Sequence, residues 1–207
     1  AKNKGVAGAG VSLYYYSLAN GNPAGHWQLG KQFELGLSFF NPNRDFTISG
    51  NPSGLPNTFG LIPGTTRSDS KLFLIPRLAA NWMIKENSSF SVSVFGHRGM
   101  NTDYPSQVFH DTGSSTTGIN LSQLFTNLTY STEFAEGHSL GLTAVIAAQF
   151  FEAKGVSSFA NFSEDPTKLS GTGSSSSIGF GFKVGYMGQL TDALSLGVVY
   201  QSRTAMG

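Results

Sequence analysis

The 207-residue chain has no cysteine, few charged residues and no long apolar run. Without cysteine it contains no disulfide and no thiolate metal site. Charged residues account for 12% of it, about half of the ~25% found in an average soluble domain. No segment reaches the ~18–20 consecutive apolar residues of a membrane-spanning helix, because the most apolar one, residues 140–151, contains Gly141, Thr143 and Gln149. The net charge of +1 indicates no attraction to nucleic acid.

Recognisable chemistry is equally scarce. The glycines of residues 5–10 lack the spacing and the strand–turn–helix context of a dinucleotide-binding loop. A serine hydrolase needs a base beside its nucleophile, yet His97 and His138 fall at opposite ends of predicted strands. The polar connection at residues 98–121 holds two aspartates and a histidine, without the spacing of metal ligands. We therefore expect no catalytic residue, no metal site and no cofactor, and we do not expect an enzyme.

What the chain does contain is regular alternation, clearest over residues 177–203. One set of alternate positions is apolar or aromatic: Ile178, Phe180, Phe182, Val184, Tyr186, Leu194, Leu196, Val198 and Tyr200. The other set is mostly polar or glycine. A period of two over this length predicts two β-strands, joined by a short turn at residues 190–192. An apolar face opposite a sparse, polar face is typical of a strand between lipid and a wet lumen.

The same pattern predicts five further strands, at residues 32–40, 71–84, 90–97, 122–134 and 139–151. Pro76 interrupts the second of them. Because proline cannot donate to a β-ladder, we expect a bulge or a local break there.

The connections between these strands alternate between long and short. The long ones cover residues 41–70, 98–121 and 152–176, and the short ones are turns of a few residues. Outer-membrane barrels have this arrangement, with tight periplasmic turns and long extracellular loops, whereas a soluble β-sandwich has no reason to sort its loops by length. The charged residues within the strands share the polar face: Glu34, Arg77, Glu133, Lys183 and Arg203. The sequence therefore predicts an all-β fold, an antiparallel transmembrane β-barrel of a Gram-negative outer membrane.

Seven strands do not close such a barrel, and an open edge in lipid leaves backbone groups unpaired at several kcal/mol each. We expect a fragment of a larger barrel, and the alternative is that another copy supplies the missing strands. Residues 1–31 do not alternate and predict a compact, irregular N-terminal segment. The first residues do not have the apolar core of a signal peptide, so we expect the mature form of a secreted protein.

Several segments, in this order, resemble the FadL-like family of long-chain fatty-acid and aromatic hydrocarbon transporters of the outer membrane. They are GVAGAGVSL at the start, the Asn22-Pro23-Ala24-Gly25 motif, QFELGLSFFNP, INLSQLF, HSLGL, QFFEAKG, FSEDPTKLSGTG and the final hairpin with YQSR. Their shared order covers essentially the whole chain, although members of this family are about twice as long.

The resemblance implies a 14-stranded barrel, of which residues 32–207 supply strands one to seven. It also implies that residues 1–31 form a plug, or hatch, inside the lumen, with Asn22, Pro23 and Ala24 as its motif. In this family a hydrophobic molecule is captured by the outer loops, passes to a site near the plug and leaves sideways through a gap in the wall. The expected function is passive uptake of fatty acids or aromatic hydrocarbons. The expected partners are this cargo, membrane lipid and lipopolysaccharide, with a monomer at full length and no nucleic acid.

The polar face carries the candidate ligand-contact residues: Phe40, Phe73, Arg77, Phe95, Phe151, Lys183 and Arg203. Inward phenylalanines favour an apolar cargo, or they pack against the plug. The three cations either hold a cargo carboxylate or pair with Glu34 and Glu133, so an acid and a neutral hydrocarbon both stay open. Glycines on this face, such as Gly141 and Gly185, leave room for a plug. The alternative function is an adhesin or receptor barrel that binds through its long loops without transport.

Overall fold

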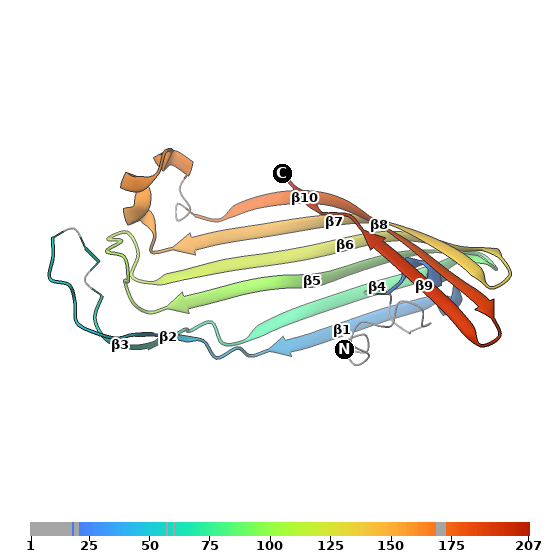
Figure 1. The fold of residues 1–207 in the computed structure, drawn as a ribbon, viewed down its shortest axis with the longest axis horizontal. Coiled ribbons are helices and arrows are strands. Elements are labelled where there is room, and N and C mark those ends of the chain that lie inside the picture. The colour runs from blue at the N-terminus through green and yellow to red at the C-terminus, as the bar shows by residue number, and fades with distance from the viewer. Residues whose placement is uncertain (1–17, 19–20, 57, 60, 169–172) are drawn as a thin grey trace.

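The computed structural model describes residues 18, 21–56, 58–59, 61–168 and 173–207. Its main sheet is antiparallel and follows the chain order, with β1 at one edge (Figure 1). The strands are β1 (Gln32–Phe40), β4 (Phe73–Lys85), β5 (Ser88–Tyr104), β6 (Thr117–Ala135), β7 (His138–Lys154), β8 (Ser175–Thr191), β9 (Leu194–Gln201) and β10 (Ala205–Met206). Both β9 and β10 pair with β8, at the other edge. All seven predicted strands are present.

The connections sort by length as expected. Turns at residues 86–87, 136–137 and 192–193 lie at one end of the sheet, and the long connections lie at the other (Figure 1). The strands nevertheless run further than predicted, so the second long connection shrinks to residues 105–116. The reason is that apolar alternation stops before backbone pairing does: Asn101 still pairs with Asn120, and Thr102 with Ile119.

The first predicted loop, residues 41–70, is not all loop. It contains a two-stranded antiparallel sheet of β2 (Asp45–Ile48) and β3 (Gly64–Arg67), with Asp45 opposite Arg67. Strands of four residues are too short to show periodicity between prolines and glycines. The third long connection contains two short 3-10 helices, η3 (Ser157–Phe162) and η4 (Pro166–Lys168).

The seventh predicted strand is interrupted, which corrects the placement of Arg203. This strand, β9, ends at Gln201, and residues 202–204 separate it from β10. Ser202 replaces regular pairing there: its backbone N–H donates to the Phe182 carbonyl at 2.9 Å, and its Oγ accepts from the Phe182 N–H at 2.9 Å. Arg203 is therefore an exposed residue in a break, not a ladder position on the polar face.

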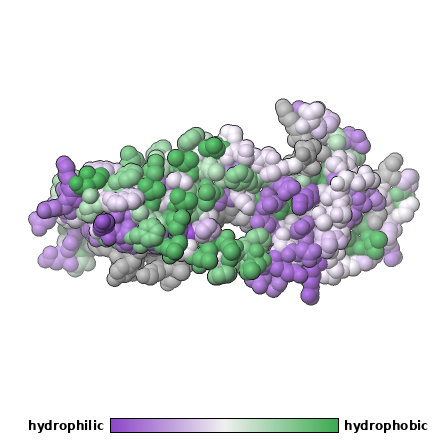
Figure 2. Space-filling model, turned by 180° about the vertical axis from the view of Figure 1, so that it is seen from behind, coloured by the Kyte–Doolittle hydropathy of each residue, from purple (hydrophilic) through white to green (hydrophobic). Residues whose placement is uncertain are grey.

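The two faces of the sheet differ as predicted. Leu142, Phe182 and Val198 are 56%, 46% and 52% exposed, while Gly181 and Lys183 on the opposite face are half-buried. Figure 2 shows apolar side chains gathered in a band between hydrophilic ends. We call the face with Leu142 the apolar face. Its exposed side chains suit contact with lipid rather than a protein core.

The opposite face is covered by the 3-10 helix η2 (Pro23–Leu29), and we call it the η2 face. This helix lies against β4, β5, β6, β7 and β8. Most of the predicted N-terminal segment, residues 1–17 and 19–20, lies outside the described residues. In the described ranges, the structure has no helix with the length and apolar character to cross a membrane.

Candidate functional site

The sheet register aligns small and polar side chains in rows on the η2 face. One row runs through Ser89, Ser131, Gly141 and Gly185, and the next through Asn81, Ser91, Thr129, Thr143 and Lys183. All but Lys183 are buried. These rows form the surface on which η2 lies, and they supply hydrogen-bonding groups to its backbone and side chains.

Asn22 attaches the start of η2 to the end of the sheet. Its side-chain Oδ1 accepts from the Ala24 N–H at 3.1 Å, which is the usual role of asparagine at a helix N-cap. Its Nδ2 donates to two carbonyls of paired residues, Tyr186 on β8 at 2.7 Å and Val198 on β9 at 3.4 Å. Pro23 follows at the first helical position, where its missing N–H costs nothing.

Two glycines provide the space for this attachment. Gly141 on β7 and Gly185 on β8 are direct ladder partners. A Cβ on Gly141 would lie 2.2 Å from the Pro23 carbonyl carbon, and one on Gly185 would lie 2.0 Å from Asn22 Oδ1. The prediction that glycines leave room on this face is confirmed at these two positions. Gly179 and Gly181 instead approach residues 202–206.

The other end of η2 is held by polar side chains of the middle strands. Asn81 Nδ2 donates to the carbonyls of His26 at 3.0 Å and Gly30 at 2.7 Å. Ser131 Oγ donates to the Ala24 carbonyl at 2.9 Å, and His26 Nδ1 lies 2.7 Å from Ser91 Oγ. Gly30 ends the helix with a positive φ of 63°. The segment is thus fixed on the sheet at both ends and in the middle.

His26 is a neutral group at physiological pH. Burial, and to a smaller extent the positive charge of Lys183, lower the pKa of its imidazole from 6.5 to about 4. Sequence reasoning missed this residue, although its place beside the Asn22-Pro23-Ala24 motif was a usable signal. A neutral imidazole suits a hydrogen bond to a serine hydroxyl in a site without solvent.

The predicted cations have different environments. Arg77 pairs with Glu34 on the neighbouring strand β1, as one of the two predicted interpretations required. The other Glu34 oxygen, Oε2, accepts from the Leu18 N–H at 3.1 Å. Within the described ranges, Lys183 forms no ion pair with Glu34 or Glu133, and it remains the cation beside His26.

Aromatic and aliphatic side chains occupy the η2 face further from the tight turns. The four predicted phenylalanines do not form one cluster. The rings of Phe40 and Phe73 are 6.3 Å apart, and Phe95 stacks on Phe125 at 6.0 Å. Phe151 is paired in the ladder with Leu121. Sequence reasoning missed Phe125 and Leu121, although both share the phase of Asn127 and Thr129.

In the described part of the sheet, the neighbouring strands β4 and β5 are not paired over their whole length. Pairing of β4 with β5 ends at Arg77 and Phe95, next to Pro76. The predicted break is found on this side only, because β4 itself continues through Pro76 and stays paired with β1. Contact resumes where the Asp69 N–H donates to the Asp103 carbonyl at 2.7 Å. We call residues 70–76 and 96–102, which lie between these contacts, the unpaired β4–β5 stretch.

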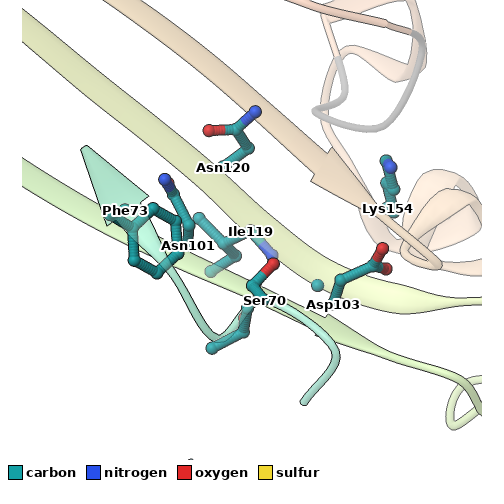
Figure 3. A pocket seen from close by; sticks show the side chains of 9 residues that line it. Ser70, Phe73, Asn101, Asp103, Ile119, Asn120 and Lys154 are labelled. Atoms are coloured by element: carbon teal, nitrogen blue, oxygen red, sulfur yellow. Dashed lines mark hydrogen bonds between the residues drawn. The ribbon is translucent and has the colours of Figure 1, made fainter. Parts of the chain in front are cut away.

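A pocket of about 220 Å³ lies beside the outer end of this stretch (Figure 3). Its lining includes Ser70, Phe73, Asn101, Asp103, Asn120 and Lys154. Asp103 Oδ1 is buried there and accepts no hydrogen bond from the described residues. The pocket combines an aromatic ring with charged and amide groups, and it contains none of the predicted cations.

The long connections contact each other through aromatic rings. Phe59, Phe109 and Phe159 come from three different connections, and their ring centroids are 5.2–5.4 Å apart. Asp111 adds a polar tie, since its carboxylate accepts from the N–H groups of Gly113 and Ser157, each at 2.9 Å. These bonds, led by those from Ser157, hold the pKa of Asp111 below its ordinary value of 3.8. In the described ranges, no group of three or more histidine or acidic residues could hold a metal ion.

Several solved structures share this arrangement of strands. The toluene transporter TodX of Pseudomonas putida matches over 90% of this chain and 50% of its own, with a TM-score of 0.63 and 19% identity. The toluene transporter TbuX of Ralstonia pickettii matches over 90% and 52%, with a TM-score of 0.63 and 18% identity. A FadL homologue of Pseudomonas aeruginosa matches over 96% and 50%, with a TM-score of 0.57 and 18% identity. This chain thus spans about half the length of these relatives.

No curated protein sequence matches the chain significantly. The model of one protein family, described as "Outer membrane protein transport protein (OMPP1/FadL/TodX)", matches residues 1–207. The match covers the whole chain, and the sheet has the fold of part of the β-barrels in this family. The chain therefore belongs to the OMPP1/FadL/TodX family of Gram-negative outer-membrane transport proteins.

Proposed function

We propose that the full-length protein takes up hydrophobic compounds passively across the outer membrane, and that residues 1–31 are its plug. The observation that carries this proposal is the attachment of η2 across β4–β8. Hydrogen bonds from Asn22, Asn81 and Ser131 hold η2 on the face opposite the lipid-facing side chains. A segment held in this way blocks straight passage along this half of the lumen, so the cargo needs another exit.

The unpaired β4–β5 stretch is the exit that we propose. Elsewhere between Gln32 and Gln201 the neighbouring strands are joined by long backbone ladders. Separating such a ladder in lipid would cost several kcal/mol for each unsatisfied group. The unpaired β4–β5 stretch has no ladder to break and is bounded by paired residues at both ends. Opening it therefore requires only side chains to move.

The phenylalanines of the η2 face are the proposed cargo contacts. Phe40, Phe73, Phe95 and Phe151 lie between the polar rows under η2 and the long connections. This places apolar surface beside the proposed exit. Because Glu34 already neutralises Arg77, Lys183 is the better candidate for holding the carboxylate of an acidic cargo. The solved relatives TodX and TbuX are toluene transporters, so a neutral aromatic cargo is equally compatible.

A reversible cross-link tests the exit. The side chain of Ile75 lies 3.1 Å from the Cβ position of Gly96, at the edge of the unpaired stretch. In a cysteine-free full-length protein, Ile75→Cys with Gly96→Cys should form a disulfide that reduces uptake of labelled toluene or fatty acid several-fold. A reductant should restore uptake.

A matched control uses Ala79→Cys with Ser93→Cys, which are direct partners where β4 and β5 are already paired. This disulfide should leave uptake unchanged. Complete cross-linking at positions 75 and 96 with undiminished uptake would show that cargo leaves elsewhere.

The exposed band on the apolar face suits membrane lipid and lipopolysaccharide, and we propose a monomer in that environment. Native mass spectrometry of the full-length protein, gently released from detergent, should give one protein copy with bound lipid. A stable dimer would contradict this proposal.

A receptor or adhesin without transport is the second candidate. It is favoured by the contact of Phe59, Phe109 and Phe159, which joins three long connections into one surface. Uptake assays on proteoliposomes separate the two functions, because an adhesin barrel would bind its ligand and leave the internal concentration unchanged.

A further inference from the structure

Arg44 connects the two sides of the unpaired β4–β5 stretch. It lies just before β2, outside the main sheet. Its guanidinium donates to the backbone carbonyl of Asn101 on β5. The same guanidinium lies over the ring of Phe73 on β4, with its Cζ 5.9 Å from the ring centroid, a separation within the range of cation–π attraction.

The backbone of Arg44 is fixed at the outer boundary of this stretch. Its carbonyl accepts from the Ser68 N–H at 2.9 Å. The fully buried Ser68 hydroxyl in turn accepts from the Asp103 N–H at 2.9 Å. This chain of contacts positions the Arg44 side chain over the break, so its contact with both strands does not depend on a freely moving loop.

The contacts of Arg44 meet a need that the break itself creates. The carbonyls of residues 96–102 that face β4 have no strand partner, and an unsatisfied backbone group in apolar surroundings is costly. A guanidinium stays charged, offers several N–H donors in one plane and stacks on aromatic rings. In the described part of the chain Arg44 forms no ion pair, so its interactions are with the two strands.

We propose that Arg44 is the residue that controls lateral passage, by bridging Phe73 and Asn101 so that cargo must displace its side chain. This inference rests on the proposed function, because it assumes that the unpaired stretch is the exit. The closing interaction is one charge-assisted hydrogen bond and one ring contact, which is weak enough to open during uptake and strong enough to keep the wall closed at rest.

Chemical labelling tests the bridge independently of transport. In a cysteine-free full-length protein, Ile75→Cys places one thiol beside the stretch, and its reaction with a water-soluble maleimide reports how often the wall is open. Adding Arg44→Ala should raise the labelling rate about tenfold, the factor expected for loss of one charge-assisted hydrogen bond. Arg44→Lys should give an intermediate rate, because lysine keeps the charge and loses the planar fork.

Two further variants complete the design. Arg67→Ala removes an exposed arginine from β3 in the neighbouring hairpin and should leave the labelling rate unchanged. Phe73→Leu keeps an apolar side chain while removing the ring under the guanidinium, so its labelling rate should rise. If Arg44→Ala fails to fold, which a heat-modifiability gel would reveal, Phe73→Leu still tests the bridge.

Uptake measured on the same variants separates this inference from the proposed exit. Arg44→Ala should raise the initial rate for both toluene and a fatty acid. Unchanged labelling in Arg44→Ala and Phe73→Leu would overturn the bridge, even if the 75–96 disulfide still blocks uptake. Loss of fatty-acid uptake alone would also overturn it, because Arg44 would then be binding the cargo carboxylate. If the 75–96 disulfide leaves uptake unchanged, the exit itself is wrong, and Arg44 cannot control it.

Discussion

Gly141 and Gly185 face each other across the β7–β8 ladder, and the space above this pair contains Asn22 and Pro23. Neither glycine has a positive φ. Both are therefore required by close approach of another backbone segment and not by their own conformation. The pair shows that the two strands and the N-terminal segment are matched in shape.

Gly141→Ala should displace η2 from the sheet. The added Cβ would lie 2.2–2.4 Å from atoms of Pro23 and Ala24, and overpacking of this kind typically costs ~1–3 kcal/mol. We expect a lower free energy of unfolding in detergent and faster proteolysis of the segment before β1. Gly36→Ala is the control, since its Cβ would lie 3.5 Å from the nearest atom, on a flexible arginine. Equal stability of the two variants would contradict the close-approach argument.

Asn22→Asp should be more damaging than Asn22→Ala. The aspartate keeps the acceptor for the Ala24 N–H but places a carboxylate against the Tyr186 and Val198 carbonyls, where Nδ2 now donates. Alanine loses these bonds without adding repulsion, at a cost of ~1–3 kcal/mol for a buried site. The chemical-denaturation midpoint should be highest for the unchanged protein, lower for Asn22→Ala and lowest for Asn22→Asp. The reverse order for the two variants would show that the capping bond outweighs the bonds to β8 and β9.

Acid should weaken the attachment of η2 to the sheet, because His26 takes up a proton. Its pKa is 6.5 in the unfolded reference and about 4 in the folded protein, so between these values the unfolded state binds more protons and stability falls as pH falls. At ~1.4 kcal/mol per pKa unit the full loss is roughly 3 kcal/mol. Measuring the free energy of unfolding at several pH values between 7 and 4 tests this loss of stability. The non-titrating variant His26→Gln should have a flatter profile, and parallel profiles would exclude His26 as the cause.

The contact that Asp111 makes between two long connections should be lost only at a lower pH than the one that affects His26. Hydrogen bonds from Ser157 and Gly113 lower its folded pKa below 3.8, so this contribution is fully present above pH 3.8 and disappears as pH falls through the folded value. Spin labels on cysteines at Ser115 and Asn161, both exposed, should report a wider distance distribution there. Asp111→Asn should broaden the distribution already at pH 7. A distribution that is unaffected by this substitution would assign the contact to the aromatic rings alone.

Alternation along the chain was enough to predict which residues share a face. Leu142 and Phe182 follow it, and so do Thr143 and Lys183 on the other side. The missing backbone donor of Pro76 predicted a local break, which is found only in the pairing of β4 with β5. Alternation failed at Arg203, because nothing in the local sequence shows that the Ser202 side chain takes over pairing with Phe182.

The candidate site was less predictable than the strands. Asn22 was identified through a family motif, but its bond to Val198 joins residues 176 positions apart. The bridge from Arg44 to Asn101 also links segments that share no pattern. Pairing of Arg77 with Glu34 was one of two open interpretations, and only the register of β1 and β4 decided it.

The sequence by itself determined the seven long strands of the main sheet, the face that most of their side chains occupy and the order of long and short connections. These properties follow from the two-residue period of a strand and from the cost of charge in lipid, which act on each segment separately. Only the tertiary structure decided where η2 is attached, which glycines are essential, where β4 and β5 separate and which cations are neutralised. Each of these depends on distances between segments far apart in the chain, and no local pattern encodes such a distance.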